Sequence, residues 1–334
     1  MLEYEFVSVV VPAYNDARAL KKTLVSLNSQ TYPKDKFEII AVDDGSADDT
    51  RECVESTWKI NDAPIIYLTQ AHKGPAAARN LGIVNARGSI IAFVDSDCVA
   101  AADWLEKISD GYDDAKIAGI GGRIMAAPTS SEISRYCAYI GMNERPEVDK
   151  TGIRYLITGN ASFRKECLLR VGGFDERYDF AGGEDPNICY RLRELGYIFQ
   201  YNPSAVVYNA HKHTFRQLIA TYFNYGKGES FLALRRLSEW DLISVTGAKR
   251  FFYFLKAMAK MALMFLDNLT LFIKFLKVPF RALSYYADGL TFREGIMYAL
   301  LDYARIFFFI QGCFFGYMTG KLKGFKKSDR RKFL

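Results

Sequence analysis

Two carboxylates stand one residue apart in the segment FVDSD, where Asp95 and Asp97 follow a run of apolar residues. Residues i and i+2 of an extended chain point to the same side, so this spacing brings two negative charges together. Carboxylate oxygens are the ligands that Mg²⁺ and Mn²⁺ prefer, and these ions often share their coordination with substrate phosphates. The pair therefore predicts a divalent-metal site, although a solvated turn with two unrelated acids would give the same triplet.

The first hundred residues must position this pair, and they alternate between apolar and amphipathic segments. The pattern predicts strands at 6–15, 37–44, 65–70 and 89–97, with helices at 16–30, 48–59 and 74–86. Such alternation indicates an α/β fold, a mostly parallel sheet with helices on both faces. Ligands of these sheets bind beyond the carboxyl ends of the strands. The polar residues at these ends are Tyr14, Asn15, Asp43, Asp44, Asp95, Ser96 and Asp97.

Composition and missing motifs exclude several classes of protein. Half of the 334 residues are hydrophobic, which is enough for a sizeable core. The six cysteines form no CxxC pair, so a zinc ribbon or a disulfide framework is not indicated and a reducing compartment fits. No GxGxxG or GxxxxGK[ST] loop follows the first strand, which argues against dinucleotide and P-loop sites. The start, MLEYEF, lacks the basic residues of a secretory signal, so we expect the protein in the cytosol.

The net charge of +6 is concentrated in the last fourteen residues, KLKGFKKSDRRKFL. A nucleic-acid-binding domain usually spreads its basic residues over a face, so this placement favours an anionic membrane surface as partner over nucleic acid. A solubilising tail is the alternative. We expect three regions: a catalytic domain at 1–235, apolar and amphipathic helices at 236–320, and the basic tail at 321–334.

The apolar region permits more than one membrane arrangement. Lysines and an aspartate interrupt residues 249–280, so an interfacial helix is expected there in place of a spanning one. A single span over 295–320 would have to bury Asp302 and Arg305, which makes interfacial helices the preferred interpretation. Helices that pack on the catalytic domain or on a second copy remain open.

At this point the sequence resembles the family 2 glycosyltransferases, inverting enzymes of the GT-A fold that use nucleotide-activated sugars. Six blocks carry the resemblance, in order and spacing: VSVVVPAYND, VDDGSADDT, GPAAARNLGI, FVDSD, TGNASFRKECLLRVGGFDE and GEDPNICYRLRELGY. The resemblance extends over residues 6 to about 230. The resemblance implies a Rossmann-like GT-A domain followed by a C-terminal helical, interfacial membrane region.

The resemblance also implies a donor site. Its base and ribose would be lined by Pro12, Ala13, Tyr14 and Asn15, with Asp44 accepting from the base and Asp43 serving the turn. Arg79 would lie near the diphosphate or brace its loop, and a structural ion pair is the alternative. Asp95 and Asp97 would hold Mg²⁺ or Mn²⁺, with Ser96 between them. Related enzymes often have a histidine at this metal, which here would be His211, although a hydrogen-bonded loop histidine is equally compatible.

The base of the reaction is implied by the GED block, where Asp185 matches the family's catalytic aspartate. Glu184 and Asp185 precede Pro186 at the start of a predicted helix, so helix capping is the competing interpretation. We expect the helix amides to keep the pKa of Asp185 low, and Glu184 to position it. His72 is expected to be a surface residue.

The resemblance further implies a non-processive enzyme, because the Q-x-x-R-W block of polysaccharide synthases is absent and FNYGKGES occupies that region. We therefore expect transfer of one sugar from a nucleotide donor, with UDP favoured and GDP the alternative. The expected acceptor is a polyprenyl- or dolichyl-linked saccharide at the cytoplasmic face of the membrane. The alternatives are a soluble or protein acceptor with helices used for oligomerisation, and a catalytically silent scaffold.

Overall fold

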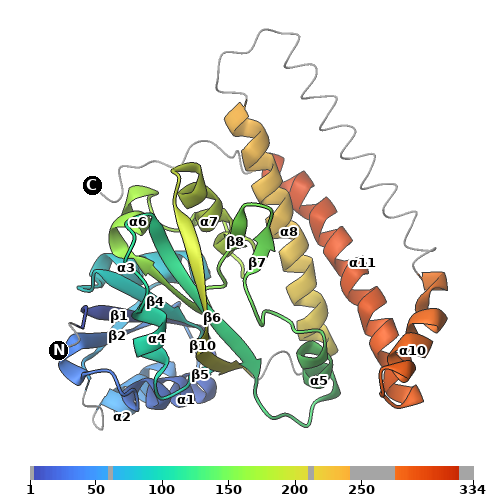
Figure 1. The fold of residues 1–334 in the computed structure, drawn as a ribbon, viewed down its shortest axis with the longest axis horizontal. Coiled ribbons are helices and arrows are strands. Elements are labelled where there is room, and N and C mark those ends of the chain that lie inside the picture. The colour runs from blue at the N-terminus through green and yellow to red at the C-terminus, as the bar shows by residue number, and fades with distance from the viewer. Residues whose placement is uncertain (1–3, 59–62, 210–213, 241–274, 323–334) are drawn as a thin grey trace. The chain divides into compact units, whose positions relative to one another are not determined.

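The computed structural model describes residues 4–58, 63–209, 214–240 and 275–322, which form two compact units (Figure 1). The first unit contains the described residues up to 209, and the second contains those from 214 onward. Residues 214–235 lie in the second unit, whereas the sequence analysis assigned them to the catalytic domain. The physical reason is that their helix packs along another helix of the second unit, as described below.

An eight-stranded sheet forms the centre of the first unit, in the order β3-β2-β1-β4-β9-β6-β10-β5. Strands β3, β2, β1 and β4 are parallel to one another, and so are β6 and β10, while β9 and β5 run antiparallel to their neighbours. The predicted α/β fold with a mostly parallel sheet is therefore confirmed. The strands are β1 (Val7–Ala13), β2 (Phe37–Asp43), β3 (Ile65–Thr69), β4 (Ile90–Val94), β5 (Cys98–Ala100), β6 (Ile117–Ala126), β9 (Asn160–Arg164) and β10 (Ile198–Asn209).

Helices cover both faces of this sheet because its central strands are apolar on both sides. In β1, Val9 and Val11 join the core under α1 (Ala17–Asn28), α2 (Thr50–Trp58) and α4 (Trp104–Ser109). Val10 points to the opposite core, under α3 (Pro75–Asn85), α6 (Lys165–Arg170) and α7 (Glu184–Glu194). The predicted strands and helices of the first hundred residues are confirmed, apart from their ends.

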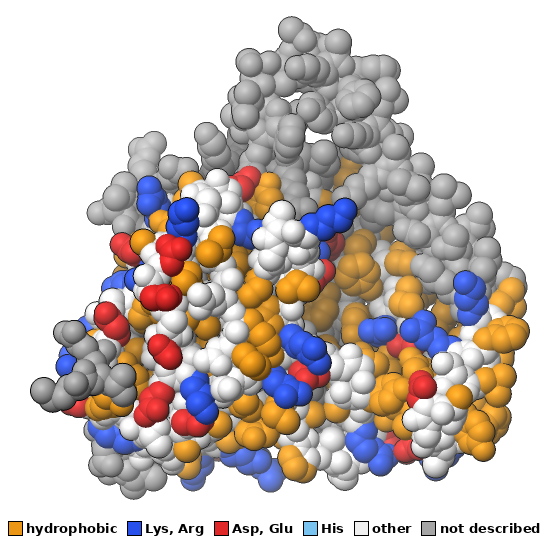
Figure 2. Space-filling model, in the orientation of Figure 1, with side chains coloured by type: hydrophobic (Ala, Val, Ile, Leu, Met, Phe, Trp, Pro, Cys, Tyr) orange, Lys and Arg blue, Asp and Glu red, His pale blue; other side chains and the backbone are white. Residues whose placement is uncertain are grey.

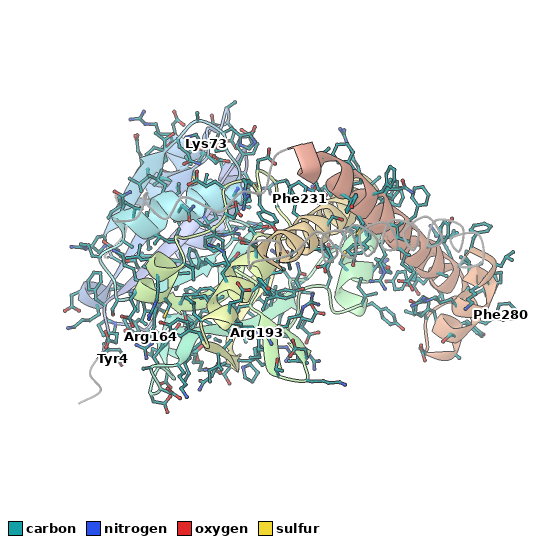
Figure 3. All side chains as sticks on the ribbon, turned by 90° about the horizontal axis from the view of Figure 1, so that it is seen from above. Tyr4, Lys73, Arg164, Arg193, Phe231 and Phe280 are labelled. Atoms are coloured by element: carbon teal, nitrogen blue, oxygen red, sulfur yellow. The ribbon has the colours of Figure 1, made fainter. Side chains whose placement is uncertain are left out.

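Smaller elements complete the first unit. They are a 3₁₀ helix (Lys34–Lys36), α5 (Glu132–Tyr139) and a hairpin of β7 (Glu147–Asp149) and β8 (Gly152–Tyr155). Arg193 of α7, labelled in Figure 3, pairs with Asp149 at 3.1 Å and so ties the hairpin to that helix.

The second unit contains α8 (Phe215–Trp240), α10 (Val278–Ala287) and α11 (Phe292–Leu322). Helices α8 and α11 pack with their backbones in contact, because glycines face each other. A Cβ on Gly226 would lie 1.9 Å from the carbonyl oxygen of Phe309, and one on Gly312 would lie 1.9 Å from that of Phe223. This contact explains the need for glycine at position 226 of FNYGKGES.

Helix α11 combines an apolar surface with one buried acid. Its segment Phe292–Tyr317 is long and apolar enough to cross a membrane, by length and composition. The carboxylate of Asp302 is buried and pairs with Arg281 of α10 at 2.7 Å and with Arg305 at 2.9 Å. The charge of Asp302 within this apolar helix is thus compensated by two ion pairs. The expected helix over 249–280 lies outside the described residues except for its last six positions, and most of the basic tail does too.

Candidate active site

The two acids of FVDSD lie on a β-turn at the end of β4. The strand ends at Val94, and the N–H of Cys98 donates to the carbonyl of Asp95 at 3.0 Å. Thr23 of α1 donates to the carbonyl of Ser96 at 2.7 Å and fixes the turn. The expectation that the strand extends through Asp97 is therefore wrong: β4 ends one residue before the first acid, and the two acids lie on the turn.

Each acid of the turn has a different polar neighbour. Arg79 donates to Oδ1 of Asp95 at 3.0 Å, and Asn209 at the end of β10 donates to Oδ1 of Asp97 at 2.8 Å. The carboxylate of Asp95 remains 41% exposed, so a ligand can reach it. Both carboxylates of the turn thus accept a hydrogen bond, one from a residue of α3 and the other from a residue of β10.

Arg79 connects this turn to the start of α7. It is buried on α3, and it donates to Glu184 Oε1 at 3.1 Å as well as to Asp95. Burial opposes its charge, but the carboxylates of Asp185, Asp95 and Glu184 together raise the pKa of Arg79, so it stays charged. Its buried Nε has no hydrogen-bond partner among the residues that the structure describes. Of the roles expected for Arg79, the structure displays an ion pair that braces the site.

Asp185 lies in the first turn of α7 and is held by Thr158. The N–H of Thr158 donates to Oδ2 at 3.0 Å, and its hydroxyl donates to Oδ1 at 2.6 Å. Burial and the adjacent Glu184 raise the pKa of Asp185 to about 7, against the lowering effects of Arg79 and Thr158. The expectation that helix amides keep this pKa low is wrong. Desolvation and a neighbouring acid outweigh the helix dipole.

The loops after β1 and β2 form a second part of the same sheet edge. Asn15 adopts a positive φ of 50°, and its N–H donates to Ser46 Oγ at 2.9 Å. Asp43 accepts from the N–H of Ser46 at 2.8 Å and from the hydroxyl of Tyr67 at 2.6 Å. The turn role expected for Asp43 thus has a counterpart in these contacts. Pro12 and Ala13 end β1, where they lie opposite Val42 and Asp43 of β2.

Asp44 is buried and accepts from several protein donors. They are Gln70 Nε2 at 2.7 Å, the N–H of Lys73 at 2.9 Å and the N–H of Gly74 at 2.8 Å (Lys73 is labelled in Figure 3). His72 Nδ1 also lies 2.8 Å from its Oδ2. The carboxylate is therefore well satisfied without a ligand.

The contacts of His72 were not predicted from the sequence. Its ring stacks on Tyr14 with centroids 4.0 Å apart, and both side chains are about half exposed. His72 is therefore a surface residue, as expected, but its stacking on Tyr14 was not foreseen. The only signal was its position after the third strand, where ligand-contacting loops are expected.

Asn160 of β9 is a second residue whose contacts were not predicted from the sequence. Its Nδ2 donates to the carbonyls of Arg123 and Ala205, each at 2.9 Å, and its Oδ1 accepts from Trp104 Nε1 at 2.8 Å. These bonds hold β9 next to the irregularity in β10 between Asn202 and Val206. The block TGNASF contained this residue without indicating its partners.

The chemistry of the donor set fits Mg²⁺ or Mn²⁺. Asp95 and Asp97 offer hard carboxylate oxygens on one turn, and the partial exposure of Asp95 leaves access to an ion. Among the described residues no group of three or more His, Cys, Asp or Glu is placed to hold a metal. His211 lies outside the described residues. Two carboxylates would leave most of the coordination sphere to phosphate and water, which suits Mg²⁺.

Comparisons with known proteins match this arrangement. The model of the glycosyl transferase family 2 matches residues 8–172, and that of the N-terminal domain of galactosyltransferase matches residues 147–214. Glycosyltransferase AglE of Haloferax volcanii is 30% identical over 249 residues, which cover 71% of this chain and 80% of that protein. The chain belongs to glycosyl transferase family 2. It is accordingly a glycosyltransferase.

Further similarities agree with the family. The pre-mycofactocin glycosyltransferase of Mycobacterium tuberculosis is 32% identical, over 72% of this chain and 50% of that protein. Among solved structures, a mannosyltransferase of Pyrobaculum calidifontis in complex with GDP-Man and Mn²⁺ superposes with a TM-score of 0.55 at 22% identity, covering 70% of this chain and 65% of that one. S. aureus TarS in complex with UDP-GlcNAc gives a TM-score of 0.52 at 20% identity, covering 68% and 65%. These structures support the predicted GT-A fold.

Proposed function

We propose that the protein is an inverting, metal-dependent transferase that moves one sugar from a nucleotide-diphosphate sugar to an acceptor hydroxyl. The observation that carries this proposal is the link made by Arg79. One buried guanidinium bonds both Asp95, on the turn that would meet the diphosphate, and Glu184, next to Asp185. A donor-binding acid and a candidate base thus lie within the reach of one side chain.

Asp185 would act as the base. Inversion requires the acceptor hydroxyl to attack the anomeric carbon from the face opposite the diphosphate and to lose its proton to a nearby group. A carboxylate whose pKa is raised to about 7 is a better proton acceptor at neutral pH than an ordinary aspartate. Arg79 and Glu184 would keep Asp185 next to the donor throughout the transfer.

Asp95 and Asp97 would hold Mg²⁺ or Mn²⁺. When bound, the ion would neutralise charge on the diphosphate leaving group. Arg79 would keep Asp95 oriented, Asn209 would keep Asp97 oriented, and Thr23 would prevent the turn from shifting. If His211 contributes a ligand, it does so from the segment that follows β10.

The nucleotide base would stack on Tyr14. This ring is 46% exposed and already carries a planar partner, His72, whose imidazole a base could replace. Displacement of His72 would also release one side of Asp44, which could then accept a hydrogen bond from the base. Pro12, Ala13 and Asn15 would border the ribose. A uridine donor is favoured, and guanosine is the alternative.

The second unit would bind the cytoplasmic face of a membrane. Its exposed apolar side chains include Phe280, Leu283 and Tyr286 on α10 and Phe292 and Ile296 on α11; Phe280 is labelled at the outer end of α10 in Figure 3. Figure 2 shows apolar groups there, with basic and some acidic side chains among them. Exposed apolar residues with basic ones beside them suit an interface with anionic lipid. The acceptor would accordingly be a polyprenyl- or dolichyl-linked saccharide.

Donor binding and vesicle binding test these two parts separately. UDP- and GDP-sugars are titrated by calorimetry with and without Mn²⁺, against the wild type and Asp97→Ala. Metal-dependent binding that is lost in Asp97→Ala supports the donor site; folded wild type that binds none of them leaves the scaffold alternative. Sedimentation with phosphatidylserine vesicles should be lost in Phe280→Ser/Leu283→Ser and kept in Val84→Ser, an exposed apolar residue of the first unit. Equal sedimentation of both variants would reject this apolar surface as the membrane contact, and a wild type that does not sediment with the vesicles would favour a soluble acceptor.

A further inference from the structure

Thr158 contacts both oxygens of the candidate base. Its hydroxyl lies 2.6 Å from Oδ1 of Asp185 and its N–H lies 3.0 Å from Oδ2, and Thr158 is itself buried. Two donors from one residue, one to each oxygen, fix the rotation of the carboxylate about its Cβ–Cγ bond. The remaining lone pairs of both oxygens then point in a defined direction.

The segment around Thr158 is held in place on both sides. The N–H of Leu156 donates to Cys189 Sγ of α7 at 3.4 Å, and the N–H of Asn160 donates to the carbonyl of Ile157 at 3.0 Å. Next to Thr158, a Cβ on Gly159 would lie 2.9 Å from Oδ2 of Asp95. This segment therefore passes between the base and the acid of the β4 turn, and Thr158 cannot move without disturbing one of them.

We propose that Thr158 is the positioning residue of the base, which orients the Asp185 carboxylate toward the acceptor hydroxyl. This inference rests on the proposed function of Asp185. It assigns a role to the Thr158 side chain that helix capping of α7 would not require.

The charged and titratable groups that face Asp185 come from three elements besides this loop. Arg79 of α3 stabilises the carboxylate, and Glu184 of α7 destabilises it. Tyr155 of β8 and Cys189 of α7 also interact electrostatically with Asp185. Thr158 is the neighbour that stabilises the carboxylate by hydrogen bonds. Loss of its hydroxyl would raise the pKa of Asp185 further.

Thr158→Val and Thr158→Ser test the proposal through the pH dependence of transfer. Valine keeps the shape and the backbone N–H but removes the hydroxyl. We expect kcat of Thr158→Val to fall about thirtyfold at pH 6 and about threefold at pH 9, with donor affinity unchanged. Thr158→Ser, which keeps a hydroxyl, should retain most of the wild-type kcat at both pH values. A loss that is equal at all pH values would overturn the proposal, because it would indicate a structural role alone.

A measurement without turnover separates this proposal from the proposed function. The carboxyl carbon of Asp185 is followed by NMR during a pH titration of ¹³C-aspartate protein and assigned with Asp185→Asn. We expect its midpoint to rise in Thr158→Val and to stay unchanged in Ser162→Ala, which removes a buried hydroxyl elsewhere in the sheet. An unchanged midpoint in folded Thr158→Val rejects the role of Thr158. A raised midpoint in a protein that transfers no sugar would instead reject the proposed function.

Discussion

The two units of the molecule each bury an acid beside arginine, Glu184 in the first and Asp302 in the second, and they balance the charge differently. In the first unit, the described carboxylates of Asp95, Glu184 and Asp185 surround the single guanidinium of Arg79. In the second unit, the single carboxylate of Asp302 receives Arg281 and Arg305, and the hydroxyl of Tyr285 as well. Excess negative charge gathers in one cluster and excess positive charge in the other.

This difference separates a reactive arrangement from a structural one. An acid that lacks enough counter-charge has a raised pKa and can exchange a proton or receive a cation. An acid with two counter-charges instead ties its helices together through ion pairs. Most of the following experiments replace one residue of either cluster, and the last replaces His72.

Asp185→Ala should have the largest effect. Removal of a general base typically lowers the rate by about 10³-fold, and donor affinity should change little because Asp185 does not bind the diphosphate. The rate is measured with a radiolabelled donor, and affinity by calorimetry. A variant that retains more than a tenth of the activity would show that Asp185 caps α7 and does not act as the base.

Arg79→Met should destabilise the first unit by about 3 kcal/mol, since the acids around it would lose their buried counter-charge. Urea unfolding followed by the fluorescence of Trp104, buried in that unit, measures the change. The control is Arg51→Met, in an exposed pair with Glu55, which should change stability by less than about 0.5 kcal/mol. Similar values for both variants would contradict the bracing role.

Asp302→Asn should cost about 2 kcal/mol in the second unit, because both arginines would keep hydrogen bonds but lose a charged partner. Far-ultraviolet circular dichroism follows the unfolding of its helices. Asp288→Asn, an exposed acid after α10, serves as control and should lie within about 0.5 kcal/mol of the wild type. Donor binding by the first unit is expected to be the same in both variants.

The pH dependence should report the raised pKa of Asp185. Only the ionised carboxylate accepts a proton, so kcat should decrease about tenfold per pH unit below a midpoint near 7. The folded protein holds this proton more tightly than the unfolded chain, whose pKa is near 3.8, so Asp185 contributes stability that is lost as the pH rises from about 4 to about 7. Asp185→Asn should lack that slope. A midpoint near 4 would contradict the burial of this acid.

His72→Ala should have the smallest effect. If the nucleotide base replaces His72 on Tyr14, the variant should bind the nucleotide up to about threefold more tightly, because no stacked ring has to be displaced. Calorimetry with UDP and GDP gives the ratio. Binding that becomes tenfold weaker would mean that His72 contacts the nucleotide directly.

Much of the first unit followed from local patterns. Apolar strands alternating with helices predicted the parallel part of the sheet, and the acids at Asp44 and Asp95 marked its carboxyl edge. The antiparallel insertion of β9 between β4 and β6 was not foreseen, because pairing partners far apart in sequence leave no periodic signal.

The electrostatics of the site were less predictable. Arg79 meets Glu184 across 105 positions of sequence, and Asp185 meets Thr158 across 27, so neither contact is visible in a motif. The sequence suggested a low pKa for Asp185 because its place on a helix can be predicted and its desolvation cannot. The same holds for His72, whose stacking on Tyr14 depends on how two loops meet.

The glycine contact between α8 and α11 has a consequence for protein engineering. With a carbonyl oxygen 1.9 Å from where a Cβ on Gly226 or Gly312 would lie, neither position accepts a larger side chain while the helices stay together. A protein truncated before Phe292 would lack α11, and the surface of α8 that contacts α11 would be left uncovered. Expression trials of the catalytic unit should therefore end before α8, near residue 214, or retain α11 in full.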